Sequence, residues 1–274
     1  MFSTFVRVIL TLISLLVFSS CSTNGISSNQ IGKSRFLFLQ KELPNISEQS
    51  EEISSINFDD QSKVIIWMHG TDRPAIAGNL NCNDDMPPES LMLAANKLDI
   101  SLYYLCSNAT DRGIKGSFIY KRVLELEETI NLFNEAGIKP HNIYLSGFSA
   151  GGWTALMAAK AIPRKFNKGV LFAPAFAGPR YETRFFPVWR KIIRPKQVEE
   201  IIKAEKLEFL IFAYEDDPFN RPKELEFLIK KDEPFPEIVG YSCKKGHFTY
   251  RKDCESKKTY ERIINFFKPQ NSGY

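Results

Sequence analysis

Residues 147–151 read Gly-Phe-Ser-Ala-Gly and place a serine between two glycines, a spacing suited to nucleophilic chemistry. Small residues two positions before and after Ser149 permit the tight strand-to-helix turn that exposes a serine hydroxyl. The helix that follows would bring its N-terminal dipole and the amide of Ala150 beneath the serine, where they stabilise an oxyanion. The motif predicts a nucleophilic Ser149 at the end of a strand. A glycine-rich turn without chemistry is the alternative that the motif alone leaves open.

The elements that position this serine are predicted by hydrophobic patterns. Apolar runs without alternation are typical of strands buried on both faces. Strands are expected at 35–40, 63–68, 101–105, 142–145, 169–172, 208–213 and 237–241. Apolar residues spaced three or four apart indicate amphipathic helices. Helices are expected at 88–98, 117–136, 153–161 and 257–267. This alternation predicts an α/β fold in which a mostly parallel sheet carries helices on both faces.

The N-terminal segment is interpreted as a targeting signal. Residues 1–20 resemble a signal peptide, because Arg7 precedes an apolar run, 8–18, that is too short to span a bilayer comfortably. Residues 18–21, Phe-Ser-Ser-Cys, resemble a bacterial lipobox with Cys21 as the lipidated residue, and secretory cleavage near Ser20 is the alternative. Residues 21–33 are polar and are expected to form a flexible tether. We expect an exported protein of the bacterial cell envelope, anchored to a membrane by lipid on Cys21 and facing the periplasm or the exterior.

Cysteine usage is consistent with export. Four of the five cysteines remain beyond Cys21, and an even set in an exported chain predicts two disulfides. Proximity favours Cys82 with Cys106 and Cys243 with Cys254, although four cysteines allow three pairings. A metal site is disfavoured, because the chain has no CxxC pair and only three histidines. No motif implies an organic cofactor.

Charge and length exclude other classes. The formal net charge of +4 is small and the basic residues are spread along the chain, so no nucleic-acid partner is expected. Basic pairs such as Lys121-Arg122 and Lys244-Lys245 are interpreted as solvated surface. Residues 34–274 are long enough to bury a sizeable core as one domain.

Residues 60–268 resemble the α/β-hydrolases through four motifs in the order that this family uses. The turn around Ser149 is one of them, and residues 67–71, Trp-Met-His-Gly-Thr, are another. In the family, a His-Gly pair after a buried strand opens the loop that supplies half of an oxyanion hole. The resemblance implies that the amides of Thr71 and Ala150 are the two donors. It also implies that His69 and Gly70 shape the loop and that His69 is not a proton carrier.

The other two motifs imply the acid and the base of a catalytic triad. Residues 213–218, Ala-Tyr-Glu-Asp-Asp-Pro, occupy the family's acid position. Spacing from Ala213, which replaces the usual glycine, selects Asp216, whereas the Asp-Pro pair selects Asp217. We favour Asp216, and the other carboxylate is available to cap the following helix. His247, within Gly-His-Phe, is the implied base, so the triad order is Ser149, then the aspartate, then His247.

The resemblance implies a serine hydrolase that cleaves a small carboxylic ester, or a related acyl bond, through an acyl-enzyme on Ser149. Residues 174–206 are aromatic-rich and form a candidate cap insertion over an apolar pocket, although the segment could instead be a helical insert whose aromatics pack into a core of their own. Two further functions stay open. One is an envelope acyltransferase with the same triad, and the other is a non-catalytic binding lipoprotein that keeps the hydrolase fold.

Overall fold

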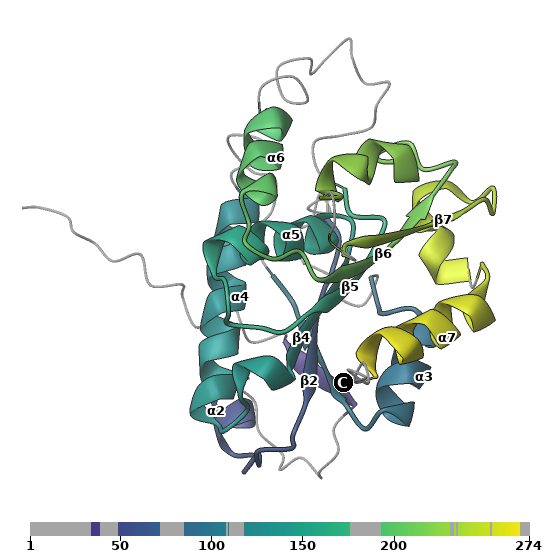
Figure 1. Cartoon of the computed structure of the whole chain (residues 1–274). Helices are drawn as coiled ribbons and strands as arrows, with labels where there is room; N and C mark the ends of the chain where they lie inside the picture. Colours follow the sequence, from purple (N-terminus) through teal and green to yellow (C-terminus); the bar gives the residue numbers. More distant parts are fainter. Residues whose placement is uncertain are drawn as a thin grey trace, which may run out of the picture.

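A seven-stranded sheet runs through the part of the chain that the structure describes (Figure 1). The computed structural model describes residues 34–38, 49–71, 85–107, 109, 118–175, 193–230, 233, 235–252 and 254–268. The strand order is β1-β3-β2-β4-β5-β6-β7. Strand β1 is antiparallel to β3, and every other neighbouring pair is parallel. The predicted class, a mostly parallel sheet within an α/β fold, is confirmed.

The strands and helices lie close to their expected bounds. The strands are β1 (Arg35–Phe38), β2 (Val64–Met68), β3 (Ser101–Leu105), β4 (Ile143–Phe148), β5 (Gly169–Phe172), β6 (Phe209–Tyr214) and β7 (Glu237–Tyr241). The α-helices are α2 (Gln49–Ser54), α3 (Glu89–Lys97), α4 (Phe118–Glu135), α5 (Ala150–Ala161), α6 (Arg194–Ile202) and α7 (Ser256–Phe267). Short 3-10 helices are η2 (Pro140–Asn142), η4 (Pro222–Leu228) and η5 (Gly246–Lys252). The main shift is at the motif itself, where β4 and α5 extend until only Ser149 separates them.

Helices cover both faces of the sheet. Helices α2, α4, α5 and α6 pack together on one face, and α3 packs with α7 on the other (Figure 1). Strand β2 shows how the core is divided. Val64, Ile66 and Met68 join the apolar cluster that includes α4 and α5, whereas Ile65 and Trp67 join the cluster that includes α3 and α7. All five residues are buried. This two-sided burial is why the run shows no alternation in sequence.

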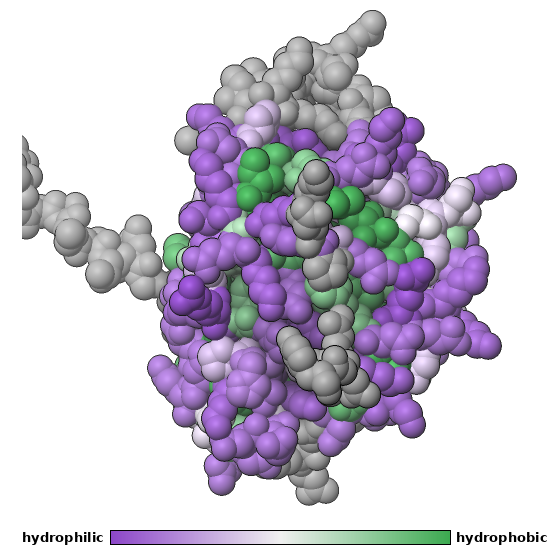
Figure 2. Space-filling model, viewed as in Figure 1, coloured by the Kyte–Doolittle hydropathy of each residue, from purple (hydrophilic) through white to green (hydrophobic). Residues whose placement is uncertain are grey.

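Helix α2 is not anticipated by the sequence patterns, and the bounds of α6 were not predicted. Helix α6 lies within the candidate cap 174–206 and is anchored to α5, because the indole N–H of Trp153 donates to Gln197 Oε1 at 2.8 Å. Figure 2 shows a mostly hydrophilic face, with hydrophobic residues gathered around α6 and η4 in the upper part of the view. The aromatic residues expected in the cap, at 176–189, lie outside the described residues. The cap and the domain bounds therefore stay predictions.

Several other predictions fall on residues that the structure does not describe. These are the signal peptide 1–20, the tether 21–33, lipidation at Cys21, and Cys82. Cys106 is disulfide-bonded, and its expected partner Cys82 lies outside the described residues. Cys243 is bonded to Cys254, the pairing that proximity favours. None of the helices in the described ranges is long and apolar enough to cross a lipid bilayer.

Candidate active site

Ser149 occupies a strained turn that depends on its flanking glycines. Its backbone angles are φ 51° and ψ −117°, a region that non-glycine residues rarely adopt. A Cβ on Gly151 would lie 2.0 Å from the carbonyl oxygen of Met68, and a Cβ on Gly147 would lie 2.6 Å from the carbonyl carbon of Gly151. Strain of this kind costs on the order of 1–3 kcal/mol and persists only where the surroundings enforce it. The two glycines allow the backbones to approach closely enough to hold Ser149 in this turn.

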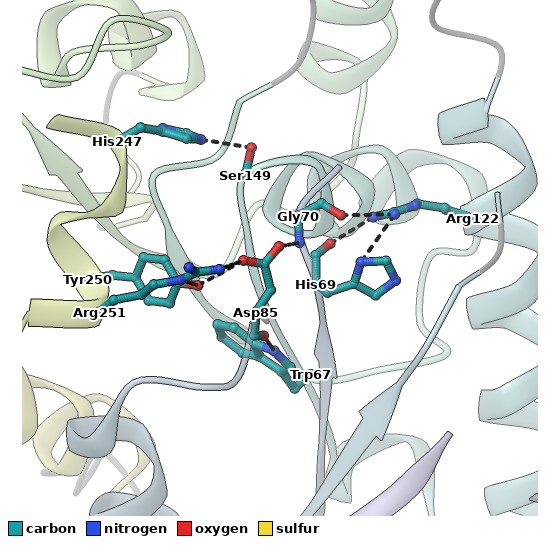
Figure 3. A network of polar contacts seen from close by, with 9 residues as sticks. All are labelled: Trp67, His69, Gly70, Asp85, Arg122, Ser149, His247, Tyr250 and Arg251. Carbon is teal, nitrogen blue, oxygen red and sulfur yellow. Dashed lines mark hydrogen bonds and ion pairs between the residues drawn. The ribbon is translucent and has the colours of Figure 1, made fainter. Parts of the chain in front are cut away.

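A buried chain of hydrogen bonds links Ser149 to an imidazole and a carboxylate. His247 Nε2 lies 2.8 Å from Ser149 Oγ (Figure 3), and His247 Nδ1 lies 2.7 Å from Asp217 Oδ2. An ionised carboxylate only accepts hydrogen bonds, so these partners assign the imidazole hydrogen to Nδ1. Nε2 then presents a lone pair to the serine hydroxyl. This is the tautomer in which a histidine can remove the serine proton.

The structure corrects the preference for Asp216 as the acid. Asp217 is fully buried; its Oδ2 lies beside His247 Nδ1, and its Oδ1 accepts the backbone N–H of Phe219 at 2.7 Å. Asp216 points elsewhere and accepts the backbone N–H of Gly246 at 2.6 Å. The reason is local turn geometry, since the amide of Asp217 closes a turn onto the carbonyl of Tyr214 at 3.1 Å and sends the two carboxylates in different directions. Asp217 therefore contacts the imidazole, and Asp216 fixes the backbone just before it.

Aromatic rings and a disulfide confine His247. The imidazole packs against the rings of Phe219 and Phe148, with centroid separations of 4.3 and 4.8 Å. It lies in η5, which begins at Gly246 with a left-handed φ of 61°. The bonded cysteines 243 and 254 flank η5 with their Cα atoms 6.0 Å apart. These contacts limit the positions that the imidazole can adopt.

The two expected oxyanion donors lie at the same edge of the sheet. Strands β2 and β4 are parallel neighbours, with Met68 paired with Gly147, so the segments that follow them emerge side by side. Ala150 is buried and is the first residue of α5, where backbone amides have no partner within the helix. Thr71 lies two residues after His69 on the segment that leaves β2. Both amides are therefore near the end of the strand that carries Ser149.

His69 is a buried structural residue. Its Nε2 lies 3.1 Å from the carbonyl oxygen and 3.0 Å from the amide nitrogen of Ser107, and its Nδ1 lies 3.4 Å from Arg122 Nη2 (Figure 3). Burial, reinforced by the positive charge of Arg122, lowers the pKa of His69 from 6.5 to about 3. The imidazole is therefore neutral near pH 7.

The lowered pKa of His69 makes the free energy of unfolding sensitive to acid. The unfolded chain protonates His69 below pH 6.5, whereas the native protein keeps it neutral down to about pH 3, so protons favour unfolding as the pH falls through this range. We expect His69 to lower the free energy of unfolding by about 2 kcal/mol between pH 6.5 and pH 5. Urea unfolding of the wild type and His69→Gln across this range measures the difference. The exposed His141→Gln variant is the control, and equal pH slopes in wild type and His69→Gln would contradict the assignment.

Two residues of the site were missed by sequence reasoning. Arg122, interpreted as solvated surface, is 2% exposed and donates to the carbonyl oxygens of His69 at 2.7 Å and Gly70 at 3.0 Å. Asp85 accepts the amide N–H of Gly70 at 3.1 Å. A signal for Arg122 exists, because it lies three residues after Ile119 and so shares the apolar face of α4. Nothing comparable in sequence marks Asp85.

Comparisons with known proteins identify the fold. No protein-family profile and no curated protein matches the sequence. One similar solved structure is monoacylglycerol lipase from Paleococcus ferrophilus, with 13% identity, a TM-score of 0.51, and a match that covers 76% of this chain and 97% of that one. Another is esterase 2 from Thermogutta terrifontis, with 16% identity, a TM-score of 0.50, and a match that covers 77% of this chain and 87% of that one. A mutant puromycin hydrolase complexed with PGG is also similar, with 14% identity and a TM-score of 0.51. The match covers 77% of this chain and 35% of that one, so this chain spans about a third of its length. The chain has the α/β-hydrolase fold, as its motifs predicted.

Proposed function

We propose that this protein is a serine hydrolase that cleaves a carboxylic ester through an acyl-enzyme on Ser149. The observation that carries the proposal is the continuous contact from Ser149 Oγ to His247 at 2.8 Å and from His247 to Asp217 at 2.7 Å. Nucleophile, base and orienting acid are arranged in the geometry of a serine hydrolase triad. Ser149 keeps 9% of its residue surface exposed.

The chemistry follows from these contacts. Ser149 Oγ attacks the ester carbonyl carbon while His247 Nε2 takes the hydroxyl proton. The amides of Thr71 and Ala150 stabilise the tetrahedral oxyanion. The imidazolium, stabilised by Asp217, then gives its proton to the departing alcohol as the carbon–oxygen bond breaks. Water repeats the sequence on the acyl-enzyme and releases the acid.

A small ester is the substrate class that best fits this proposal. The solved structures of similar fold include an esterase and a lipase, both covered almost fully by the matched region. The rings of Phe148, Phe219 and Phe248 surround the imidazole, and Phe248 is 49% exposed. An apolar surface beside the reacting atoms favours an acyl or aryl group over a charged one.

Labelling with a fluorophosphonate probe tests the proposal without knowledge of the substrate. An activated serine attacks the phosphorus, so we expect the wild type to be labelled once, on the peptide that contains Ser149. His247→Ala should react very slowly, because the proton acceptor is gone, and Ser149→Ala should not react.

The chain offers a matched serine control in β4. Ser146 is fully buried and its hydroxyl donates to the carbonyl oxygen of Val170 at 2.6 Å, so it is not available as a nucleophile. Ser146→Ala should therefore be labelled like the wild type. A folded wild type that takes up no label, or a label on another residue, would contradict the proposed function.

A further inference from the structure

The peptide group on each side of Gly70 is held by a charged side chain. The N–H of Gly70 donates to Asp85 Oδ2 at 3.1 Å, and its carbonyl oxygen accepts from Arg122 Nη2 at 3.0 Å (Figure 3). Gly70 also has no room for a side chain, since a Cβ would lie 2.8 Å from Asp85 Oδ2 and 3.0 Å from Phe148. The backbone between β2 and Thr71 is therefore fixed from two directions.

Arg122 holds this segment in place through hydrogen bonds from its planar guanidinium to backbone carbonyls. It reaches from α4 and donates to three backbone carbonyls, those of His69 at 2.7 Å, Gly70 at 3.0 Å and Ala109 at 3.2 Å. A planar guanidinium presents its donors in a fixed geometry, so two consecutive carbonyls are held in a defined orientation. Burying a charge is costly unless its hydrogen bonds are satisfied, and here backbone oxygens satisfy them. A buried arginine used in this way specifies a backbone conformation.

The orientation of the Thr71 amide follows from the bond to the Gly70 carbonyl. In a planar trans peptide, the C=O of one residue and the N–H of the next point in opposite directions. Because Arg122 fixes the Gly70 carbonyl, it also fixes the opposite direction for the Thr71 N–H. The second expected donor, Ala150, is oriented separately by α5.

We propose that Arg122 is a positioning residue that aims the Thr71 amide at the oxyanion, and that Asp85 holds the same segment from the other side. This inference rests on the proposed function. Asp85 also ties the segment to the histidine. Its Oδ1 contacts Arg251 and lies 3.4 Å from the hydroxyl of Tyr250, and both residues belong to η5 with His247 (Figure 3). The two halves of the site thus share one carboxylate.

The test measures kcat and KM for hydrolysis of p-nitrophenyl acetate. The concentration of active sites is determined by titrating a sample to completion with the fluorophosphonate probe, so that kcat is expressed per active site. This separates an effect on positioning from a loss of folded protein. An oxyanion donor acts mainly in the transition state, so its misdirection lowers kcat and leaves KM nearly unchanged. For Arg122→Met we expect kcat to fall about 100-fold, in the range found for losing one donor. Arg122→Lys, which can still reach one carbonyl, should recover part of the loss.

Two further variants keep the inference testable if Arg122→Met folds poorly. Asp85→Asn removes a charge from a partly exposed side chain, and we expect kcat to fall about tenfold, since small misplacements cost up to 100-fold. Phe133→Leu, in the fully buried core beside Tyr103, is the stability control. It should lower the melting temperature and leave kcat per titrated site unchanged.

The possible outcomes distinguish a failure of the positioning role of Arg122 from a failure of the proposed hydrolase function. An unchanged kcat per titrated site in both Arg122→Lys and Asp85→Asn would overturn the positioning role while leaving the hydrolase intact. A fall in kcat in Phe133→Leu equal to that in the Arg122 variants would also overturn it, because the effect would then be one of stability. A wild type that neither turns over the ester nor takes up the probe would remove the proposed function and this inference together.

Discussion

Replacing Ser149 with alanine is expected to abolish ester hydrolysis, with a loss in kcat of about a millionfold. Under the proposed mechanism, the substitution removes the atom that bonds to the substrate, Ser149 Oγ, which lies 2.8 Å from His247 Nε2. Alanine at φ 51° is as strained as serine, and the serine side chain makes no capping hydrogen bond to α5 that alanine would lose. The melting temperature should therefore change little. Turnover of p-nitrophenyl acetate, measured together with thermal unfolding, checks both parts of the expectation.

The control for this experiment is Ser146→Ala, which should keep turnover near the wild-type value. Its hydroxyl donates to the backbone carbonyl of Val170. If Ser149→Ala retained wild-type turnover, the nucleophile would lie elsewhere. If it lost turnover and also unfolded, the comparison would be repeated with Ser149→Gly, which tolerates a positive φ without strain.

The second large effect is expected at Asp217. Asp217→Asn should lower kcat about 10⁴-fold, because an amide can donate to His247 Nδ1 and stabilise the tautomer whose Nε2 carries the hydrogen. That tautomer cannot accept the serine proton. Asp217 contacts Nδ1 at 2.7 Å and is completely buried, so bulk solvent does not reach the carboxylate.

Asp216→Asn is the matched comparison, one residue away and of the same chemistry. An asparagine oxygen can still accept the N–H of Gly246, now held at 2.6 Å, so kcat should stay within a fewfold of the wild type. Steady-state kinetics of the two variants side by side decides the assignment. A large loss in Asp216→Asn with a small one in Asp217→Asn would restore the acid that the sequence pattern favoured.

The limits of the sequence patterns are clearest at this pair of aspartates. The motif predicted the acid in the turn after β6, because a buried strand followed by carboxylates is visible in the residues themselves. Which carboxylate faces the imidazole depends on the turn from Tyr214 to Asp217, and adjacent residues in a turn point in different directions. Spacing from Ala213 cannot decide which of two adjacent aspartates contacts the imidazole.

The sequence patterns missed Arg122 and Asp85 because the roles of these residues depend on long-range contacts. The strands and the helix at Ser149 follow local periodicity, so they were predictable. Arg122 and Asp85 act on Gly70 from positions 52 and 15 residues away, and their roles depend on how distant elements pack. Arg122 could have been suspected from its place on the apolar face of α4, where a charge needs a partner. Asp85 has no such pattern.

The contact between Asp85 and Arg251 spans 166 residues of the chain, and that between Ser149 and His247 spans 98. Contacts between such distant positions close large loops, which is entropically costly and tends to slow folding. The parts of the chain that hold the nucleophile and the oxyanion segment leave a ribosome well before η5 does. The contacts of Ser149 and Asp85 with η5 can therefore form only after residues up to Arg251 have been synthesised, and the proposed activity would report that η5 has docked.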